Sequence, residues 1–226
     1  MKTWPIQMSS GHTLKRPPCV TEPFVYGSTL EGLDWDLYWE LNESFPKPPK
    51  KAIGPNKLHS HNADTVLSNN NFPQVWRDFV ERHTSREFAE STIGKVPEHF
   101  CVRGTGSHRN FQTECQIAYN SPPIELGRVR GPHVDNGHQI YKFLLYFRDP
   151  HDKSIGGDLI FHGLLDNPRI MGKRGWTDKS VEEIYRIPYA QNSMGFFLNS
   201  PLSIHSVSPR EASEYSRRFV VVSASH

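Results

Sequence analysis

The stretch GPHVDNGHQIYKFLLYF, residues 131–147, joins a polar, glycine-flanked start to a long apolar run. The run is rich in aromatic and branched residues and is bounded by turn residues, which is typical of a buried strand. His133 and Asp135 stand at the mouth of this strand. Because side chains two positions apart in an extended chain project to the same side, an imidazole and a carboxylate can here reach one ion together. The pair alone is weak evidence in a chain with 12 histidines.

The chain after about residue 110 continues in short β-rich runs broken by Gly, Pro, Asn and Asp. These runs are CQIAYN, QIYKFLLYF, DLIFHG, EIYRIPYA, MGFFLN, LSIHSVS and RRFVVVSAS. Such a series predicts a β-sandwich or barrel.

The first hundred residues favour helices. Ser28 and Glu31 form a capping-box pattern, and leucines then repeat at helical spacing until Phe45-Pro46. Residues 46–71 are rich in Pro, Lys, Asn and His and are interpreted as a long surface loop. A second helix is expected from Pro73, and a third from the Thr84/Glu87 pattern.

Length and composition bound the class of protein. The 226 residues predict one domain, residues 1–226, with a helical and loop layer over about 1–110 and a β core over about 111–226. The formal charge of +2 gives no argument for a nucleic-acid partner. No apolar run resembles a signal peptide or a membrane span, so no membrane association is expected. Cys19, Cys101 and Cys115 have no metal-type spacing, and an odd number of cysteines fits poorly with a disulfide framework, which favours the reducing cytoplasm.

A third candidate ligand lies in NSPLSIHSVSPR, where His205 stands in a strand of apolar and hydroxyl side chains. A single histidine there would more often be a hydrogen-bonded core residue. Combined with His133 and Asp135, it completes a set of two histidines and one carboxylate. That set leaves coordination positions open and is typical of non-heme Fe(II) enzymes that bind O₂ and a co-substrate.

The last strand begins with two arginines, Arg217 and Arg218. A guanidinium at the base of an apolar barrel would bind a dicarboxylate with two parallel hydrogen bonds. Because alternation places neighbouring residues on opposite faces of a strand, at most one of the two arginines points inward.

Together these residues resemble the Fe(II)/2-oxoglutarate-dependent dioxygenases of the double-stranded β-helix fold, also called jelly-roll or cupin-like. The resemblance rests on PHVDN, on GGDLIF (156–161), on NS…HSVSP and on RRFVVVS, and covers about residues 115–225. It implies a mostly β protein, a jelly-roll core with N-terminal helices packed on it. It also implies Fe(II) held by His133, Asp135 and His205, with 2-oxoglutarate and O₂ consumed and succinate and CO₂ released.

The resemblance assigns the co-substrate residues as well. It favours Arg218 for the distal carboxylate of 2-oxoglutarate, because the family's arginine is often followed by an aromatic residue, here Phe219; Arg217 is the fallback. Tyr146 is similar in position to a tyrosine that hydrogen-bonds the same carboxylate. Lys142, on the same side of the strand, is a weaker candidate.

The expected reaction is hydroxylation of a C–H bond in a small molecule, such as an amino acid or a biosynthetic intermediate. The alternatives are a peptide or protein side chain as substrate, desaturation or cyclisation at the same site, and a non-catalytic cupin-like binding protein. Substrate contacts are expected from the 46–71 segment, from Arg128 and Arg130, and from the insert 166–183 with Trp176. The sequence does not indicate an oligomeric state.

Overall fold

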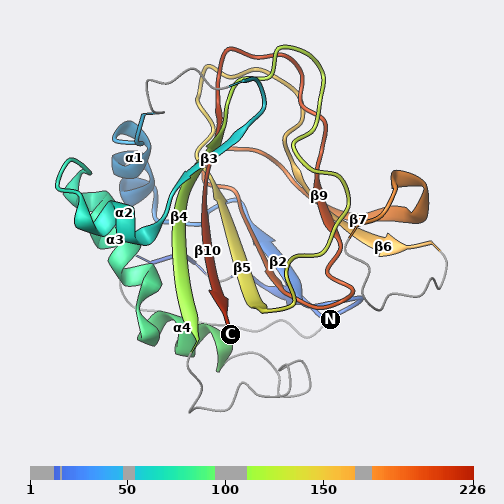
Figure 1. Cartoon of the computed structure of the whole chain (residues 1–226), viewed down its shortest axis with the longest axis horizontal. Helices are drawn as coiled ribbons and strands as arrows, with labels where there is room; N and C mark the ends of the chain where they lie inside the picture. Colours follow the sequence, from blue (N-terminus) through green and yellow to red (C-terminus); the bar gives the residue numbers. More distant parts are fainter. Residues whose placement is uncertain (1–12, 16, 48–53, 95–110, 166–174) are drawn as a thin grey trace.

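Two antiparallel β-sheets face each other in the computed structural model, which describes residues 13–15, 17–47, 54–94, 111–165 and 175–226 (Figure 1). The larger sheet has the strand order β1-β2-β8-β5-β10-β4-β3. Its strands are β1 (Cys19–Val20), β2 (Tyr26–Thr29), β3 (Leu58–His61), β4 (Gln112–Asn120), β5 (Gln139–Tyr146), β8 (Met194–Leu198) and β10 (Arg217–Ser225). This order confirms the predicted jelly-roll core, and each of the β-rich runs contributes a strand.

The smaller sheet has the order β7-β6-β9, formed by β6 (Leu159–Leu164), β7 (Val181–Ile187) and β9 (His205–Val207). A short 3₁₀ turn, Asp178–Ser180, leads into β7. Residues 127–133 run along the remaining edge of β9. They are joined to its segment by backbone bridges between Gly127 and Arg210 and between His133 and His205. The start of the quoted stretch is thereby tied to the strand that carries the third candidate ligand.

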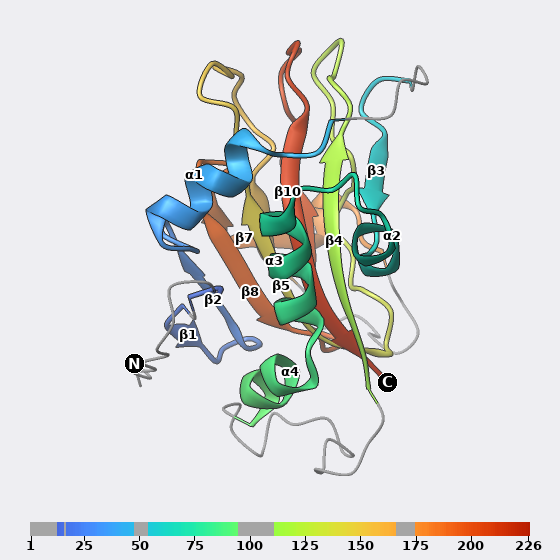
Figure 2. The same ribbon diagram turned by 90° about the vertical axis from the view of Figure 1, so that its left-hand side faces the viewer.

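Four helices lie on the outer side of the larger sheet: α1 (Trp35–Glu43), α2 (Ala63–Ser68), α3 (Gln74–Thr84) and α4 (Arg86–Ile93). Figure 2 shows α1, α3 and α4 in front of the strands of this sheet. Apolar residues of these helices, such as Tyr38 and Trp76, form one core with Phe143 and Val220 from the sheet. No helix in the described part of the chain is long and apolar enough to cross a membrane.

A second core fills the space between the two sheets. It contains Leu144 of β5, Phe161 of β6, Phe197 of β8 and Phe219 of β10. Because side chains alternate along β5 and β10, one set of residues faces this interior and the other faces the helices. Both strands are therefore covered on both sides, which explains why their sequences are almost continuously apolar.

The predicted start of the first helix is wrong. Ser28 lies in β2, opposite Gly195 of β8, and its hydroxyl bonds to the hydroxyl of Tyr185 at 2.8 Å. The helix begins only after Asp34, and the Leu30 side chain is 64% exposed. Sheet pairing with β8 outweighs the local capping pattern here. The helix predicted from the Thr84/Glu87 pattern is α4, and it starts one residue later than that pattern suggested. Its N-cap is Ser85, whose hydroxyl accepts from the Phe88 amide.

The segment 46–71 is not a plain loop in the residues that the structure describes. It contains β3, which pairs with β4, and α2, whose Asn62 cap accepts from the Thr65 amide at 3.0 Å. Residues 48–53 of this segment lie outside the described part. Strand β3 carries only four residues and has no apolar alternation, so its sequence lacked the strand signal.

His83 of α3 is a buried structural histidine with a testable pH effect. Its Nδ1–H donates to the Phe79 carbonyl at 2.7 Å, and its Nε2 accepts from the Leu14 amide at 3.1 Å. Burial lowers the pKa of His83 from 6.5 to about 4. Because the folded state disfavours the proton, the stability that neutral His83 contributes is complete above about pH 6.5 and is lost as the pH falls toward 4.

We therefore expect the wild-type protein to lose more unfolding free energy between pH 7.5 and pH 4.5 than the His83→Gln variant, by on the order of 2 kcal/mol. Glutamine can accept the same amide hydrogen bond but does not titrate. Urea unfolding of both proteins at both pH values measures the difference. The other histidines titrate in both proteins, so their effects cancel. Equal losses in the two proteins would contradict the prediction.

Candidate metal centre

His133 and His205 lie side by side on paired backbone segments. The His133 amide donates to the His205 carbonyl at 2.9 Å, and the His205 amide donates to the His133 carbonyl at 2.8 Å. Their ring centroids are 4.2 Å apart. Two residues after His133, the chain brings the Asp135 carboxylate against both rings. The three residues predicted as metal ligands are thus brought together by the tertiary structure.

The orientation of the two rings suits metal binding. Each Nδ1 lies within hydrogen-bond distance of a carbonyl two residues earlier, Gly131 at 2.8 Å and Ser203 at 2.9 Å. These bonds place the proton on Nδ1 and leave the Nε2 lone pairs facing Asp135, at 3.8 Å for His133 and 3.6 Å for His205. One ligand atom from each of the three residues lies within 4.8 Å of the others. The set can close on a single ion.

Burial keeps these imidazoles neutral. It lowers the pKa of His133 to about 4 and that of His205 to about 3. Burial alone would raise the pKa of the Asp135 carboxyl. The facing groups, mainly His205 and Lys142, outweigh burial and hold that pKa below its ordinary value. At neutral pH the site therefore presents two neutral nitrogens and one carboxylate, the protonation state that a divalent transition metal requires.

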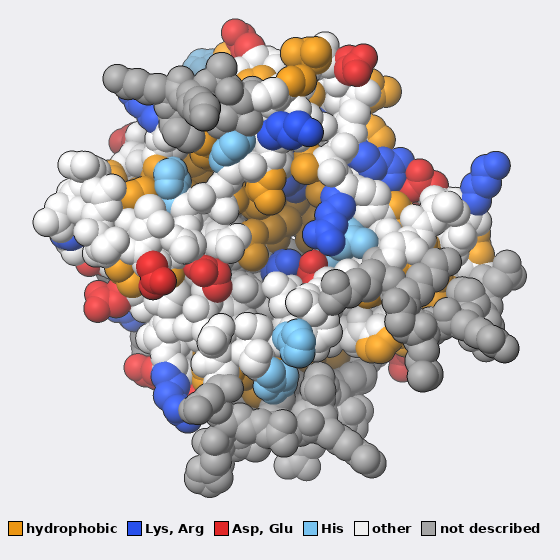
Figure 3. All heavy atoms as spheres, in the orientation of Figure 1, with side chains coloured by type: hydrophobic (Ala, Val, Ile, Leu, Met, Phe, Trp, Pro, Cys, Tyr) orange, Lys and Arg blue, Asp and Glu red, His pale blue; other side chains and the backbone are white. Residues whose placement is uncertain are grey.

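Two cations surround the Asp135 carboxylate. The Lys142 ammonium donates to its Oδ2 at 2.6 Å, and a guanidinium nitrogen of Arg130 lies 4.0 Å from its Oδ1. Lys142 thus contacts a candidate metal ligand. Arg130 is 61% exposed at the edge of the site. In the orientation of Figure 1, the surface is hollowed near its centre, where hydrophobic side chains lie with charged and histidine side chains around them (Figure 3).

Arg217 points into the space between the sheets. Its side chain donates to the Gly157 carbonyl at 2.7 Å and to the Tyr146 hydroxyl at 2.7 Å, and lies over the rings of Tyr146 and Phe219. It is 2% exposed and forms no ion pair within the described part of the chain. A buried cation without a carboxylate partner is costly, so an anion bound beside Arg217 would stabilise it.

The structure places Arg218, the arginine preferred from the sequence, away from Arg217. The Arg218 guanidinium lies on the helix side of the larger sheet, where it donates to the Phe147 carbonyl at 2.9 Å and to Asn42 of α1 at 3.1 Å. It also lies over the ring of Phe45. Strand alternation puts Arg218 on the face opposite Arg217, so the fallback residue is the one inside the β-helix.

Strand β5 links the candidate ligand cluster to Arg217. Lys142, Leu144 and Tyr146 are alternate residues of this strand, so their side chains share its inner face. At one end Lys142 contacts Asp135, and at the other Tyr146 contacts Arg217. The two groups of residues therefore stand at the two ends of one interior face.

Sequence reasoning missed two features of the surroundings of Arg217. Gly156 and Gly157 both have positive φ, +92° and +83°. A Cβ on Gly157 would lie 3.3 Å from the Arg217 side chain, so the glycine lets its carbonyl approach the guanidinium. The other feature is Asn120 of β4, which faces Arg217 across the sheet. The glycine pair was visible as a turn signal, whereas nothing in the sequence marks Asn120.

The residues expected to contact a substrate are only partly near the cluster. Arg128 is tied to Asp178 by two hydrogen bonds, of 2.7 and 2.8 Å. Trp176 is buried, in a small apolar cluster with Val134 and Ile204. Residues 166–174 of the expected insert lie outside the described part of the chain. The Arg130 guanidinium lies 4.0 Å from Asp135, and the described end of the insert reaches the cluster through a backbone bridge between Gly175 and His133.

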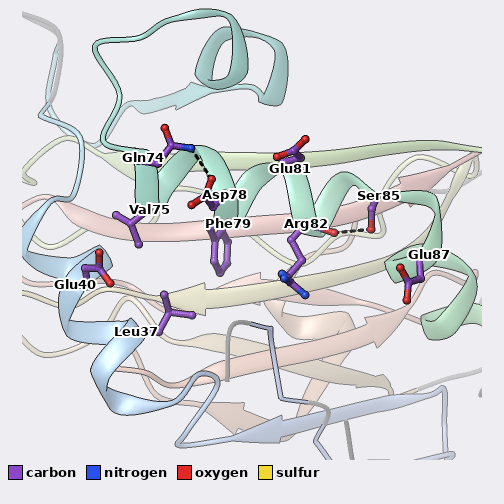
Figure 4. Close-up of a pocket in the computed structure, with 10 residues that line it drawn as sticks. All are labelled: Leu37, Glu40, Gln74, Val75, Asp78, Phe79, Glu81, Arg82, Ser85 and Glu87. Atoms are coloured by element: carbon purple, nitrogen blue, oxygen red, sulfur yellow. Dashed lines mark hydrogen bonds between the residues drawn. The ribbon is translucent and has the colours of Figure 1, made fainter. Parts of the chain in front are cut away.

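A separate groove lies between α1 and α3, on the helix side of the larger sheet (Figure 4). It encloses about 730 Å³ and carries several acidic side chains, including Glu40, Asp78 and Glu87. None of the predicted site residues lines it. The sheet separates it from the three candidate ligands, so it is not the candidate metal centre.

The fold and the ligand set define a class of protein: a double-stranded β-helix with a candidate metal site of two histidines and one carboxylate. Solved structures with the same fold include a prolyl-4-hydroxylase from Pseudomonas putida, with 13% identity, a TM-score of 0.51, and 89% of this chain and 92% of that chain covered. Another is a prolyl hydroxylase from Trichoplax adhaerens in complex with a hypoxia inducible factor peptide fragment. It has 11% identity, a TM-score of 0.53, and coverage of 88% and 83%. At these identities the likeness establishes the fold.

No protein-family model matches the sequence, and no curated protein matches it.

Proposed function

We propose that this protein is an Fe(II)- and 2-oxoglutarate-dependent oxygenase that hydroxylates a C–H bond. The observation that carries the proposal is the pairing of two sites on one interior face. His133, Asp135 and His205 form a candidate ligand set at one end, and Arg217, a buried cation with no ion pair among the described residues, lies at the other. A dicarboxylate that chelates a metal with its 2-oxo acid end needs a cation at its far end. The prolyl hydroxylases with the same fold support this choice.

The ligand set fits ferrous iron because two imidazoles and one carboxylate occupy one side of the ion and leave other positions open. When bound, iron would supply the activation of O₂ that drives oxidative decarboxylation of 2-oxoglutarate and oxidation of the substrate. Lys142 would hold Asp135 in place, while Arg217 and Tyr146 would orient the co-substrate. The apolar wall, including Phe161 and Phe197, would exclude water from the reaction.

The substrate that we propose is a small molecule with a carboxylate, such as an amino acid. Arg130 supports this choice, because its only described acidic neighbour, Asp135, already accepts from Lys142 and would also bind the metal. By contrast, Arg128 is neutralised by Asp178. A guanidinium that keeps donors available beside the candidate metal centre can bind a substrate carboxylate in a defined orientation.

The first experiment is to measure succinate formed from 2-oxoglutarate by purified protein loaded with Fe(II) under anaerobic conditions and then exposed to O₂. Succinate that requires Fe(II) and rises with a pool of cell metabolites supports the oxygenase. If a protein with verified iron occupancy neither binds 2-oxoglutarate nor forms succinate, the proposal fails, and a non-catalytic binding protein takes its place.

Fractionation of the same pool tests the substrate class. The component that stimulates succinate formation is expected to bind an anion-exchange resin. Its half-saturating concentration should rise about tenfold or more in Arg130→Gln, in line with the loss of a charge-assisted hydrogen bond. Arg128→Gln, which removes a guanidinium already paired with Asp178, is the matched control. A stimulating component that is cationic, or equal shifts in both variants, would argue against a carboxylate substrate.

A further inference from the structure

Asn120 is a buried amide directly opposite Arg217. The two residues are cross-strand partners in the pairing of β4 with β10. Asn120 is 2% exposed, and its Oδ1 accepts from a guanidinium nitrogen of Arg217 at 3.3 Å. Because a guanidinium can only donate, this bond fixes the amide with its oxygen toward Arg217. The Nδ2 group then has no hydrogen-bond acceptor within the described part of the chain.

Such a group is expensive to bury. An unsatisfied buried donor destabilises the folded state, and Leu, with nearly the same shape, would avoid that cost. Asn120 also lies beside a cation that forms no ion pair in the described residues. One acceptor-rich anion bound beside Arg217 and Asn120 would satisfy both groups.

Tyr146 adds a further donor at the same place. Its hydroxyl oxygen accepts from Arg217, so its own proton is left to donate. Burial raises the pKa of Tyr146 to about 12, with the nearby Arg217 acting in the opposite sense, so the hydroxyl keeps its proton at neutral pH. Arg217, Tyr146 and Asn120 therefore present one charge, one hydroxyl donor and one amide donor, all on the inner face of the sheet.

We propose that Asn120 binds the distal carboxylate of 2-oxoglutarate directly and also positions Arg217. This inference rests on the proposed function. Arg217 supplies the charge, Tyr146 the hydroxyl hydrogen bond, and Asn120 Nδ2 an additional hydrogen bond to the carboxylate. Since that bond exists only for a ligand with a carboxylate at its far end, Asn120 contributes to selection of a dicarboxylate.

The test compares two ligands by calorimetry on the whole protein loaded with Mn(II) in place of iron, so that binding is measured without turnover. The ligands are 2-oxoglutarate and 2-oxopentanoate, which has the same 2-oxo acid end but no distal carboxylate. The main variant is Asn120→Leu. The matched control is Asn42→Leu, which alters the buried amide that accepts from Arg218 on the opposite face.

Wild-type protein should prefer 2-oxoglutarate. In Asn120→Leu the affinity for 2-oxoglutarate should fall about tenfold, the loss of one hydrogen bond to a charged group, while the affinity for 2-oxopentanoate stays within about twofold. Asn42→Leu should leave the preference unchanged. Asn120→Asp keeps the shape and places a carboxylate against Arg217. It should abolish the preference, and it stands in for the main variant if leucine prevents folding.

An unchanged preference in Asn120→Leu, or an equal loss of both ligands, overturns the role of Asn120 in carboxylate binding. If only Asn120→Asp folds, a retained preference in that variant overturns it. A wild-type protein that binds Mn(II) but has no preference for 2-oxoglutarate instead overturns the proposed function. The two failures are therefore distinguishable.

Discussion

Replacing His205 by alanine is expected to abolish succinate formation and to weaken metal binding by more than about a hundredfold. Loss of a residue that only hydrogen-bonds a metal ligand already weakens metal binding by up to about a hundredfold, and loss of the ligand itself should cost more. His205 supplies one of three ligand atoms that lie within 4.8 Å of one another. Its backbone pairing with His133 does not involve the side chain, so the variant keeps the two remaining ligands in place. Titration with Mn(II) and the succinate assay measure the two losses.

His162→Ala is the control for this experiment. His162 is also a buried histidine of the smaller sheet, but its Nε2 bonds to the Ser206 hydroxyl at 2.8 Å and it is not part of the ligand set. It should retain metal binding and 2-oxoglutarate turnover. If His205→Ala binds Mn(II) as tightly as His162→Ala, the three residues are not the metal site.

Replacing Arg217 by methionine is expected to weaken 2-oxoglutarate binding by about a hundredfold or more. The variant removes the buried charge and two hydrogen bonds that a carboxylate could receive, each worth about 1.5–3 kcal/mol. Arg217→Lys should recover only part of the affinity, because an ammonium lacks the planar fork of the guanidinium. Calorimetry with the Mn(II)-loaded protein measures each affinity.

Arg218→Met is the matched comparison, one residue along the same strand. Its guanidinium contacts Phe147 and Asn42 on the helix side, so its loss should change 2-oxoglutarate affinity by less than about twofold, although it can lower stability. The opposite ranking of the two variants would restore Arg218 as the co-substrate residue and refute the assignment of Arg217.

Local sequence pattern predicted secondary structure correctly where both faces of a strand are buried. It failed where pairing with a neighbouring strand determines the secondary structure. Strands β5 and β10 are apolar on both faces, and their sequences predicted them. Ser28 satisfied a capping pattern but joins β2, because β8 offers hydrogen-bond partners that no window around Ser28 contains. Strand β3 has no apolar alternation and exists because the edge of β4 is there to pair with.

The sequence by itself determined the kind of core and the three candidate ligands. The signals are local: the β-rich runs, the two-residue spacing of His133 and Asp135, and the strand pattern around His205. It also determined that Arg217 and Arg218 face opposite sides, because alternation is a property of any strand.

Only the tertiary structure decided which of the two arginines points into the interior between the sheets. The inner face of β10 is the one that meets the smaller sheet, and its outer face is the one covered by α1 and α3, so Arg217 is inside and Arg218 outside. The register of β4 against β10 likewise places Asn120 opposite Arg217, although the two residues are far apart in the chain. Pairing register and the covering of a face are set by long-range contacts, which no local pattern contains.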